Sequence, residues 1–275
     1  MRGSVADGVA GPWRAGAVKG RAADGAVAGT WRAGCTAVGL AAAGLAVAQA
    51  GPGITALSPV RDRLFPRLSG RGWAGHVALT FDDGPDPAAT PLFLEALADR
   101  RLRATFFMLG SRVAREPAMA AEVAAAGHEI GVHGWEHRFL PLRGPRATFA
   151  DLARARDVIA EATGRVPWLF RPPYGVLTSP ALAAARAWGL TSVLWTCWGR
   201  EWTPGSDAAT VYATLADGLD GGGTVLLHDS DVTSPAGSCR AALGALPALL
   251  NECARRNLLV GPLGEHGPAW SPPGP

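Results

Sequence analysis

The chain of 275 residues carries almost no net charge once its first residues are set aside. Residues 1–34 contain five basic and two acidic side chains, which accounts for the whole formal net charge of +3. The 21 basic and 21 acidic side chains that remain cancel one another. Because binding to the phosphates of DNA or RNA depends on clustered positive charge, the sequence predicts no nucleic-acid partner.

Cysteine is also scarce, and the chain has only Cys35, Cys197, Cys239 and Cys253. If residues 240–252 form one helix, a rise of 1.5 Å per residue places Cys239 and Cys253 about 21 Å apart, beyond the reach of a disulfide. Only a break at Pro247 would change that. We therefore expect buried free thiols and no disulfide framework.

A long apolar run occurs at residues 33–50, where only Thr36 and Gln49 are polar and the end is the A-x-A-like Ala48-Gln49-Ala50. Together with the basic leader before it, residues 1–50 resemble an export signal or a signal anchor. The alternative is a buried helix rich in alanine and glycine. We expect an extracytoplasmic protein, secreted or membrane-anchored through residues 33–50, of unknown oligomeric state.

From His76 onward, short runs typical of strands alternate with alanine-rich helical patterns. The strand-like runs are residues 76–81, 103–109, 127–133, 167–171, 191–198, 223–228 and 257–261. Helical patterns cover residues 90–100, 117–126, 147–163, 180–188, 207–219 and 240–256. This alternation predicts an α/β fold with about seven parallel strands, which fits a compact barrel. We expect a linker at 51–75, a domain at 76–264 and a disordered tail at 265–275.

Unusual polar residues follow most of the predicted strands, where each strand ends. They are Asp82 and Asp83, His133, Arg171, Glu201, and His228. In parallel α/β folds the carboxyl ends of the strands lie on one face, and active sites are built there. The sequence therefore predicts an active site made of these side chains.

The motif "HGWEH" places His133 and His137 four residues apart, so a helical turn would point both rings the same way. Two histidines and one carboxylate commonly hold a catalytic divalent metal. With Asp82 and Asp83 nearby, one acid could bind the metal while the other accepts a proton from the attacking water. The simpler alternative is an Asp-Gly turn, but such a turn needs only one acid.

The same motif also matches H-x-x-E-H, in which two histidines bind zinc and Glu136 would be the base of a peptidase. That motif belongs inside a long helix. Gly134 within it and Pro141 soon after leave little room for such a helix.

Two further stretches offer catalytic groups. In "FRPPYG", Arg171 could orient an acid, and the rigid turn could aim the Tyr174 backbone N–H at a developing oxyanion. In "TVLLHDS", His228 could act as a general acid, while Leu226 would form a wall of the substrate pocket. Taken singly, each stretch could be an ordinary loop.

Taken in order, "TFDDGP", "HGWEH", "RPPY", "WGREW" and "LLHD" resemble the five motifs of the polysaccharide deacetylase family, also called carbohydrate esterase family 4 or the NodB-homology domain. The resemblance covers residues 76–262. It implies a distorted (β/α) barrel and a metal-dependent hydrolase. Such an enzyme removes N-acetyl, or sometimes O-acetyl, groups from a bacterial cell-wall glycan such as peptidoglycan or from chitin-like oligomers.

The resemblance also implies roles for individual residues. Asp83, His133 and His137 would hold the metal; zinc is expected, with cobalt, nickel and manganese as alternatives. The catalytic groups would be Asp82 as general base, Arg171 orienting it, the Tyr174 N–H at the oxyanion, and His228 as general acid with Glu201. The substrate would be bound by Leu226, Trp202 and Tyr174.

Two positions depart from the family pattern. Gly134 stands where Ser or Thr is common, so we expect a supporting hydrogen bond to be missing there. Glu201 stands where Asp is common, which lengthens the acid by one methylene. A rival interpretation is a carbohydrate-binding relative that stacks sugars on Trp135, Trp198 and Trp202.

Overall fold

The computed structural model describes residues 43–44 and 46–270. The chain divides into two units, residues 1–45 and residues 46–275, and only two residues of the first unit are described. Most of the predicted export segment, with Cys35, therefore lies outside the described residues. Among the helices that are described, none is both long and apolar enough to cross a membrane.

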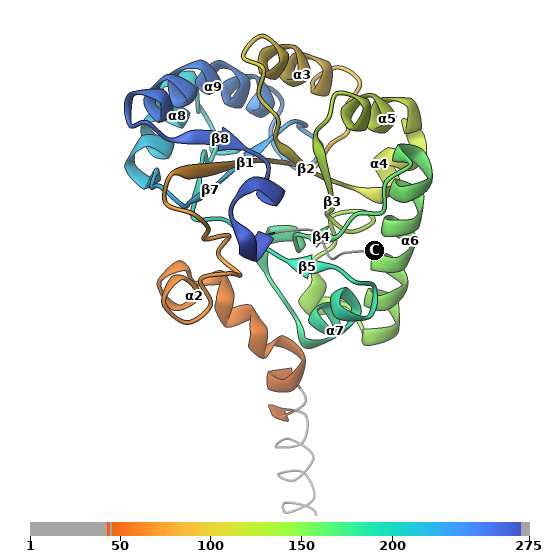
Figure 1. Ribbon diagram of the computed structural model, residues 1–275. Helices are drawn as coiled ribbons and strands as arrows, with labels where there is room; N and C mark the ends of the chain where they lie inside the picture. Colours follow the sequence, from red (N-terminus) through yellow and green to blue (C-terminus); the bar gives the residue numbers. More distant parts are fainter. Residues whose placement is uncertain (1–42, 45, 271–275) are drawn as a thin grey trace, which may run out of the picture. The chain divides into compact units, whose positions relative to one another are not determined.

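The second unit is built on one sheet of parallel strands, surrounded by helices (Figure 1). The strands are β1 (His76–Asp82), β2 (Thr105–Met108), β3 (Glu129–Val132), β4 (Leu169–Phe170), β5 (Thr191–Ser192), β6 (Cys197–Trp198), β7 (Thr224–His228) and β8 (Leu259–Gly261). Their order is β5-β4-β3-β2-β1-β7-β6, and β8 pairs with the beginning of β1. The expected α/β fold with parallel strands is confirmed.

The predicted strand 191–198 differs from the structure, because it forms two short strands instead of one. β5 pairs with β4 at one edge of the sheet, and β6 pairs with β7 at the other. The four residues between them carry the chain from one edge to the other. A single run of sequence therefore bridges the opening between the two edges, which makes the barrel distorted rather than evenly closed.

The six predicted helices are present, and each lies within a few residues of its expected range. The α-helices after residue 51 are α2 (Ser58–Leu64), α3 (Thr90–Ala98), α4 (Gly110–Arg115), α5 (Pro117–Ala125), α6 (Pro145–Thr163), α7 (Ser179–Ala187), α8 (Ala208–Gly218) and α9 (Ser238–Arg255). α9 continues through Pro247, so Cys239 and Cys253 stay far apart on one helix. Both are buried free thiols, as is Cys197.

Residues 51–75, predicted as a linker, instead pack against the sheet. They form a 3₁₀ helix, η1 (Gly51–Ala56), followed by α2. Arg61 of α2 is 1% exposed and donates hydrogen bonds to the carbonyls of Thr55 and Trp195. The Leu194 N–H donates to the Leu68 carbonyl at 2.7 Å. This segment satisfies the backbone between β5 and β6, which is the physical reason that it is ordered.

Residues 265–270, predicted as part of a disordered tail, are folded in the structure. Two short 3₁₀ helices, η4 (Leu263–Glu265) and η5 (Pro268–Trp270), follow β8. The Trp270 ring is fully buried and its N–H donates to the Arg71 carbonyl. Residues 271–275 lie outside the described residues.

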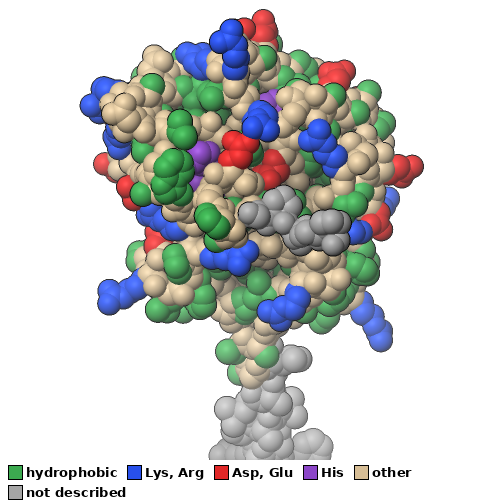
Figure 2. All heavy atoms as spheres, in the orientation of Figure 1, with side chains coloured by type: hydrophobic (Ala, Val, Ile, Leu, Met, Phe, Trp, Pro, Cys, Tyr) green, Lys and Arg blue, Asp and Glu red, His purple; other side chains and the backbone are tan. Residues whose placement is uncertain are grey.

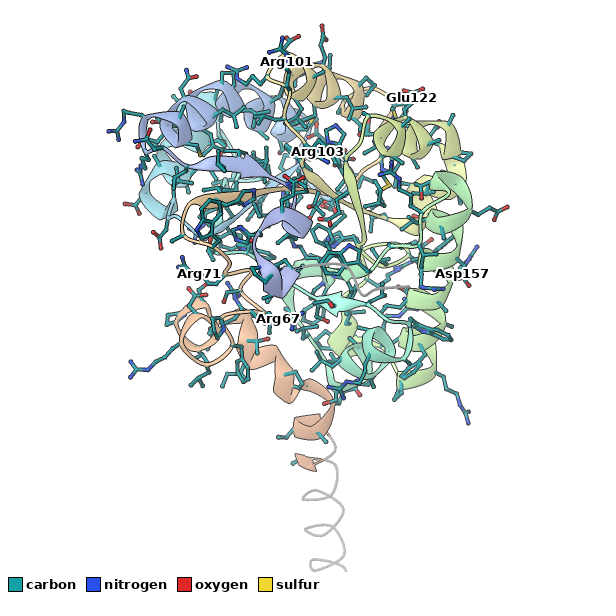
Figure 3. The ribbon with its side chains drawn as sticks, in the orientation of Figure 1. Arg67, Arg71, Arg101, Arg103, Glu122 and Asp157 are labelled. Atoms are coloured by element: carbon teal, nitrogen blue, oxygen red, sulfur yellow. The ribbon has the colours of Figure 1, made fainter. Side chains whose placement is uncertain are left out.

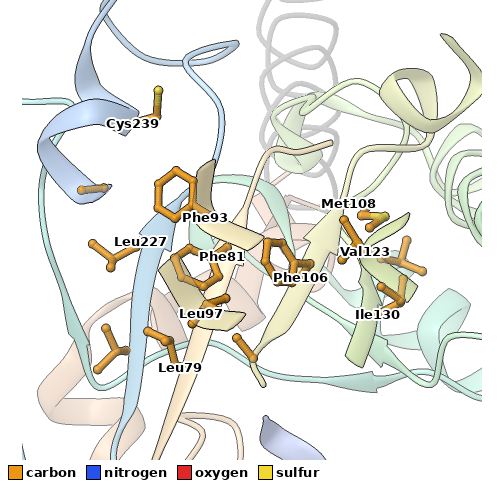
Figure 4. Packing of buried hydrophobic residues seen from close by; sticks show 14 of the residues in the cluster. Leu79, Phe81, Phe93, Leu97, Phe106, Met108, Val123, Ile130, Leu227 and Cys239 are labelled. Carbon is orange, nitrogen blue, oxygen red and sulfur yellow. The ribbon is translucent and has the colours of Figure 1, made fainter. Parts of the chain in front are cut away.

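Alternation along the strands divides the buried side chains into two sets. One set faces the surrounding helices, and Phe81 packs there against Phe93 of α3 and against Phe106 (Figure 4). A smaller set lies inside the barrel and includes Phe107 and Trp270. The strands thus have a helix-facing side and an inward-facing side, and the inward side leads to the site described below.

On the face drawn in Figure 2, basic side chains are scattered among acidic and hydrophobic ones. They do not gather into one patch on that view of the described residues.

Candidate active site

Four predicted site residues lie at the carboxyl ends of strands, either as the last residue of the strand or as the residue directly after it. They are Asp82 of β1, His133 after β3, Arg171 after β4, and His228 of β7. Side chains alternate between the two faces of a strand, so residues two apart point the same way. Asp82 therefore shares the inward face with Ala78, and His228 shares it with Leu226. The predicted convergence at the carboxyl ends of the strands is what the structure shows.

The Asp83 side chain also points into the site, although it follows Asp82 directly and strand alternation would turn it to the outer face. Its φ of +77° is a left-handed conformation that is uncommon for residues other than glycine. Asp83 is fully buried, and its Oδ1 lies 3.4 Å from His133 Nε2 and 3.6 Å from His137 Nε2. Thr233 donates a hydrogen bond to the other oxygen.

His133 is held in one orientation and one tautomer. Its Nδ1 donates to the Arg171 carbonyl at 2.8 Å, so the neutral ring keeps a lone pair on Nε2. Burial lowers the pKa of His133 to about 3. Burial lowers the pKa of His137 as well, against the opposing charge of Asp83. Both rings are therefore neutral near pH 7, which is the form that binds a metal.

The "HGWEH" segment is a loop rather than the helical turn that the spacing predicted. Gly134 and His137 both have positive φ, +84° and +55°. These two left-handed residues fold the loop so that the rings of His133 and His137 lie 4.9 Å apart, centroid to centroid. The rings still converge, but the backbone achieves this without a helix.

The three predicted ligands fit a divalent metal. One donor atom from each of Asp83, His133 and His137 lies within 4.8 Å of the other two. Among the described residues, the buried Asp83 Oδ1 has no hydrogen-bond partner. Such an atom is costly to bury unless something binds it. Two imidazoles and one carboxylate are a suitable donor set for zinc or cobalt, with positions left open for a reactant.

Asp82 and Arg171 form a buried pair beside this donor set. Arg171 Nη1 donates to Asp82 Oδ1 at 2.7 Å and to Thr80 Oγ1 at 2.8 Å, while Nη2 donates to the Leu194 carbonyl. The other oxygen, Asp82 Oδ2, is 3.7 Å from His133 Nε2. Burial raises the pKa of Asp82, opposed by the charge of Arg171. Arg171 thus orients the carboxylate and leaves one oxygen facing the site.

His228 and Glu201 form the second buried pair. Glu201 Oε1 accepts hydrogen bonds from both the backbone N–H and Nδ1 of His228, at 2.7 and 2.8 Å. Burial by itself lowers the pKa of His228, but the charges of Glu201, Asp83 and Asp82 outweigh it and raise that pKa to about 9. Despite its extra methylene, Glu201 therefore reaches the histidine and favours its protonated form.

A pocket of about 340 Å³ opens beside these pairs. Its lining includes Asp82, His133, His137, Tyr174, Gly175, Trp195, Trp198, Trp202, Leu226, His228, Thr233 and Ser234. The Trp202 ring stands edge-on to His228, 5.4 Å away, and Tyr174 lies 4.4 Å from the His137 ring. The lining is thus mostly apolar and includes a few polar groups, as in most small-ligand sites.

Sequence reasoning missed several residues of this site. Thr233 and Ser234 come from the loop after β7, and Trp195 comes from the bridge between β5 and β6. Trp195 approaches Gly175 so closely that a Cβ there would lie 2.6 Å from its ring. Thr233 and Ser234 closely follow the predicted strand end at His228, but nothing in the local sequence indicates that they enter the site.

Glu136 does not lie where a peptidase base would. It is part of a loop, and its Oε2 accepts a hydrogen bond from Arg138 at 3.0 Å. The long helix that the H-x-x-E-H interpretation requires is absent from this described part of the chain.

Comparison with known proteins places the chain among glycan-modifying enzymes. A family model described as polysaccharide deacetylase matches residues 70–193. A chitooligosaccharide deacetylase of Bradyrhizobium sp. (strain ANU 289) is 34% identical over 195 residues, which cover 68% of this chain and 88% of the relative.

A peptidoglycan N-acetylglucosamine deacetylase of Listeria monocytogenes is 32% identical over 160 residues, which cover 58% of this chain. The match spans only 34% of that relative's length. Among solved structures, a family 4 acetyl xylan esterase from Clostridium thermocellum in complex with a cobalt ion superposes with a TM-score of 0.61 at 28% identity. That match covers 69% of this chain and 88% of the esterase.

Proposed function

The chain belongs to the polysaccharide deacetylase family, and we propose that it hydrolyses N-acetyl groups of a glycan with the help of a divalent metal. One observation carries this proposal. The donor set of Asp83, His133 and His137 lies at the same barrel mouth as the Asp82–Arg171 and Glu201–His228 pairs. A hydrolase of this kind needs all three: a place for the metal, a base and an acid.

The division of labour follows from the contacts. Asp82 accepts a proton from the attacking water through Oδ2, the oxygen that Arg171 leaves free. His228, held protonated by Glu201, delivers a proton to the departing amine nitrogen. The Tyr174 backbone N–H stabilises the negative charge that develops on the acyl oxygen. His228 Nε2 faces the site, since Nδ1 is engaged by Glu201.

Asp83, His133 and His137 would hold the metal, with zinc as the expected ion. When bound, the ion would lower the pKa of the attacking water and polarise the acyl carbonyl. The cobalt ion in the Clostridium relative supports a divalent ion in this family.

The apolar side of the pocket suits a small acyl group. Leu226 and Trp202 would enclose its methyl, and Tyr174 would form another part of the wall. The named relatives act on chitooligosaccharides and on peptidoglycan N-acetylglucosamine, so we take an N-acetylglucosamine polymer or oligomer as the substrate class. Such a substrate lies outside the cytoplasm when it is part of a cell wall, which agrees with an export role for residues 33–50.

The test is acetate release from N-acetylglucosamine oligomers by the full chain, after chelation and again after zinc is added back. We expect release only with zinc. No release in either state, from protein that binds zinc, would refute deacetylation of this substrate class. Zinc-independent release would refute the role of the metal.

The rival interpretation, a carbohydrate-binding relative without catalysis, is not favoured. Binding by Trp198 and Trp202 would not require a buried base, a buried acid and three convergent ligands. Stoichiometric zinc together with turnover separates the two interpretations.

A further inference from the structure

The loop between His133 and His137 is held from two sides, although Gly134 offers no side chain for support. On one side lies the first turn of α4. The Gly110 N–H donates to the Gly134 carbonyl and the Ser111 N–H donates to the Trp135 carbonyl, both at 2.9 Å. The two carbonyls of the loop are therefore fixed by helix α4.

Helix α6 holds the other side of the loop. Asp151, which is 8% exposed, accepts a hydrogen bond through Oδ2 from the Trp135 N–H at 2.9 Å. Its Oδ1 is 3.4 Å from Arg143 Nη2. One turn along the same face of the helix, the Arg154 guanidinium lies 3.5 Å from the centre of the Trp135 ring. Asp151 thus holds the backbone of this residue, and Arg154 covers its ring.

The fit between the loop and the two helices leaves no spare room. A Cβ on Gly110 would lie 2.7 Å from the Trp135 ring and 2.8 Å from Ala155 Cα. A Cβ on Gly134 would lie 3.2 Å from Asp151 Oδ2. The backbone at Gly134 therefore sits directly against the carboxylate that supports the loop.

We propose that Asp151 is a positioning residue of the metal site, which holds the Trp135 backbone and thereby keeps His133 and His137 at ligating distance. This inference rests on the proposed function. It also explains how the loop keeps a supporting hydrogen bond without the Ser or Thr expected at position 134. The support comes from a helix that begins eight residues after His137. Groups that orient metal ligands commonly change metal affinity by 10–100-fold when they are removed.

The experiment measures zinc affinity of the full chain by competition with a coloured chelator, together with the melting temperature of the metal-free protein. Asp151→Ala should weaken zinc binding about 10–100-fold. Asp151→Asn keeps an oxygen that can accept from the Trp135 N–H and should bind zinc like the parent. Should the alanine variant fail to fold, Asp151→Ser, whose hydroxyl ends one atom short of the carboxylate oxygen, takes its place with the same expectation.

Asp157→Ala is the matched control. Asp157 lies on the same helix, and its side chain is 69% exposed (Figure 3). Within the described part of the chain, its one ion pair is with its neighbour Arg156. This variant should keep the parent's zinc affinity. Parent-like affinity of Asp151→Ala, or an equal loss in Asp151→Asn, would overturn the proposal.

The outcomes separate this inference from the proposed function. If the variants differ in zinc affinity as expected but the parent releases no acetate, only the deacetylase proposal fails. If the parent is an active zinc enzyme and the variants bind zinc equally, only the role of Asp151 fails. A parent that binds no zinc would overturn both.

Discussion

Strand β1 begins at His76 and ends at Asp82, and both side chains are buried, yet the two ends of the barrel interior are built differently. At the amino end, His266 Nε2 donates to the carbonyls of Gly70 and Gly222, at 3.0 Å each. Its Nδ1 must then accept, and His76 donates to it at 2.8 Å. Burial lowers the pKa of both rings, that of His266 to about 4, so both are neutral near pH 7.

At the carboxyl end, the buried groups include carboxylates and histidines, and several carboxylate oxygens accept no hydrogen bond from the described residues. Among the described residues, Asp83 Oδ1 and Glu201 Oε2 are buried without a hydrogen-bond partner. A buried acceptor of this kind costs stability. The amino end has such an atom as well, His76 Nε2, so unpaired atoms alone do not distinguish the two ends. The difference is that the two neutral rings at the amino end bond to each other and to neighbouring chain segments. The carboxyl end instead gathers carboxylates and histidines beside a pocket, as is usual in parallel barrels.

The largest expected effect is on kcat, and it comes from replacing the proposed base at the carboxyl end of β1. Asp82→Asn removes the proton acceptor but none of the three ligands, so kcat should fall by about 10²–10⁴-fold while zinc remains bound. The measurement is acetate release together with zinc content. A variant that keeps more than roughly a tenth of the parent's kcat would contradict the base assignment.

A smaller effect, of another kind, is expected at the amino end. His266→Leu removes the ring's hydrogen bonds to the carbonyls of Gly70 and Gly222, which keep Thr224 and Gly72 as donors. It also leaves the buried His76 N–H without a partner. The free energy of unfolding should fall by roughly 2–4 kcal/mol, while kcat per folded molecule stays at the parent value. Urea unfolding and acetate release measure the two quantities. Loss of kcat without loss of stability would show that the two ends are not separate in function.

The smallest expected effect is the pH dependence of the free energy of unfolding that the His266 ring contributes. His266 has a pKa of about 4 when folded against its usual 6.5, so the unfolded chain binds more protons between these values. Acidification through this window therefore destabilises the folded state. From pH 7.5 to pH 5.5 the ring should lose about 1 kcal/mol of its contribution.

The check for this pH effect is the difference in unfolding free energy between the parent and His266→Leu at the two pH values. Taking the difference removes the opposing titration of buried carboxylates such as Asp82, whose raised pKa favours the folded state on acidification. A difference that stays constant or grows as the pH falls would contradict the neutral, buried state of His266.

Much of the fold was predictable because its signals are local. In the sequence, helix α6 appears as an apolar pattern with a period of 3.6 residues, and strand β1 appears as an apolar run. Both elements lie where they were expected. The run 191–198 was not predictable as two strands, since both halves have the composition of one strand. What separates them is the position of their partners, β4 and β7, on opposite edges of the sheet.

The site shows the same division. The positions of four site residues were predictable, because the end of a strand and the alternation of its side chains can be recognised from consecutive residues. These are Asp82, His133, Arg171 and His228. Thr233 and Asp151 were not predictable, since each acts through a hydrogen bond to a residue distant in the sequence. The helical turn expected at "HGWEH" failed because Gly134 and His137 adopt positive φ, which spacing alone does not reveal.

The sequence by itself determined most of the strands and helices and the chemical types of the side chains that follow the strands, because these depend on residue type and short-range spacing. The tertiary structure alone decided the left-handed turn that brings Asp83 inward, the packing of residues 51–75 between β5 and β6, and the support that α4 and α6 give to the histidine loop. These features depend on hydrogen bonds and close contacts between segments that meet only when the barrel has formed.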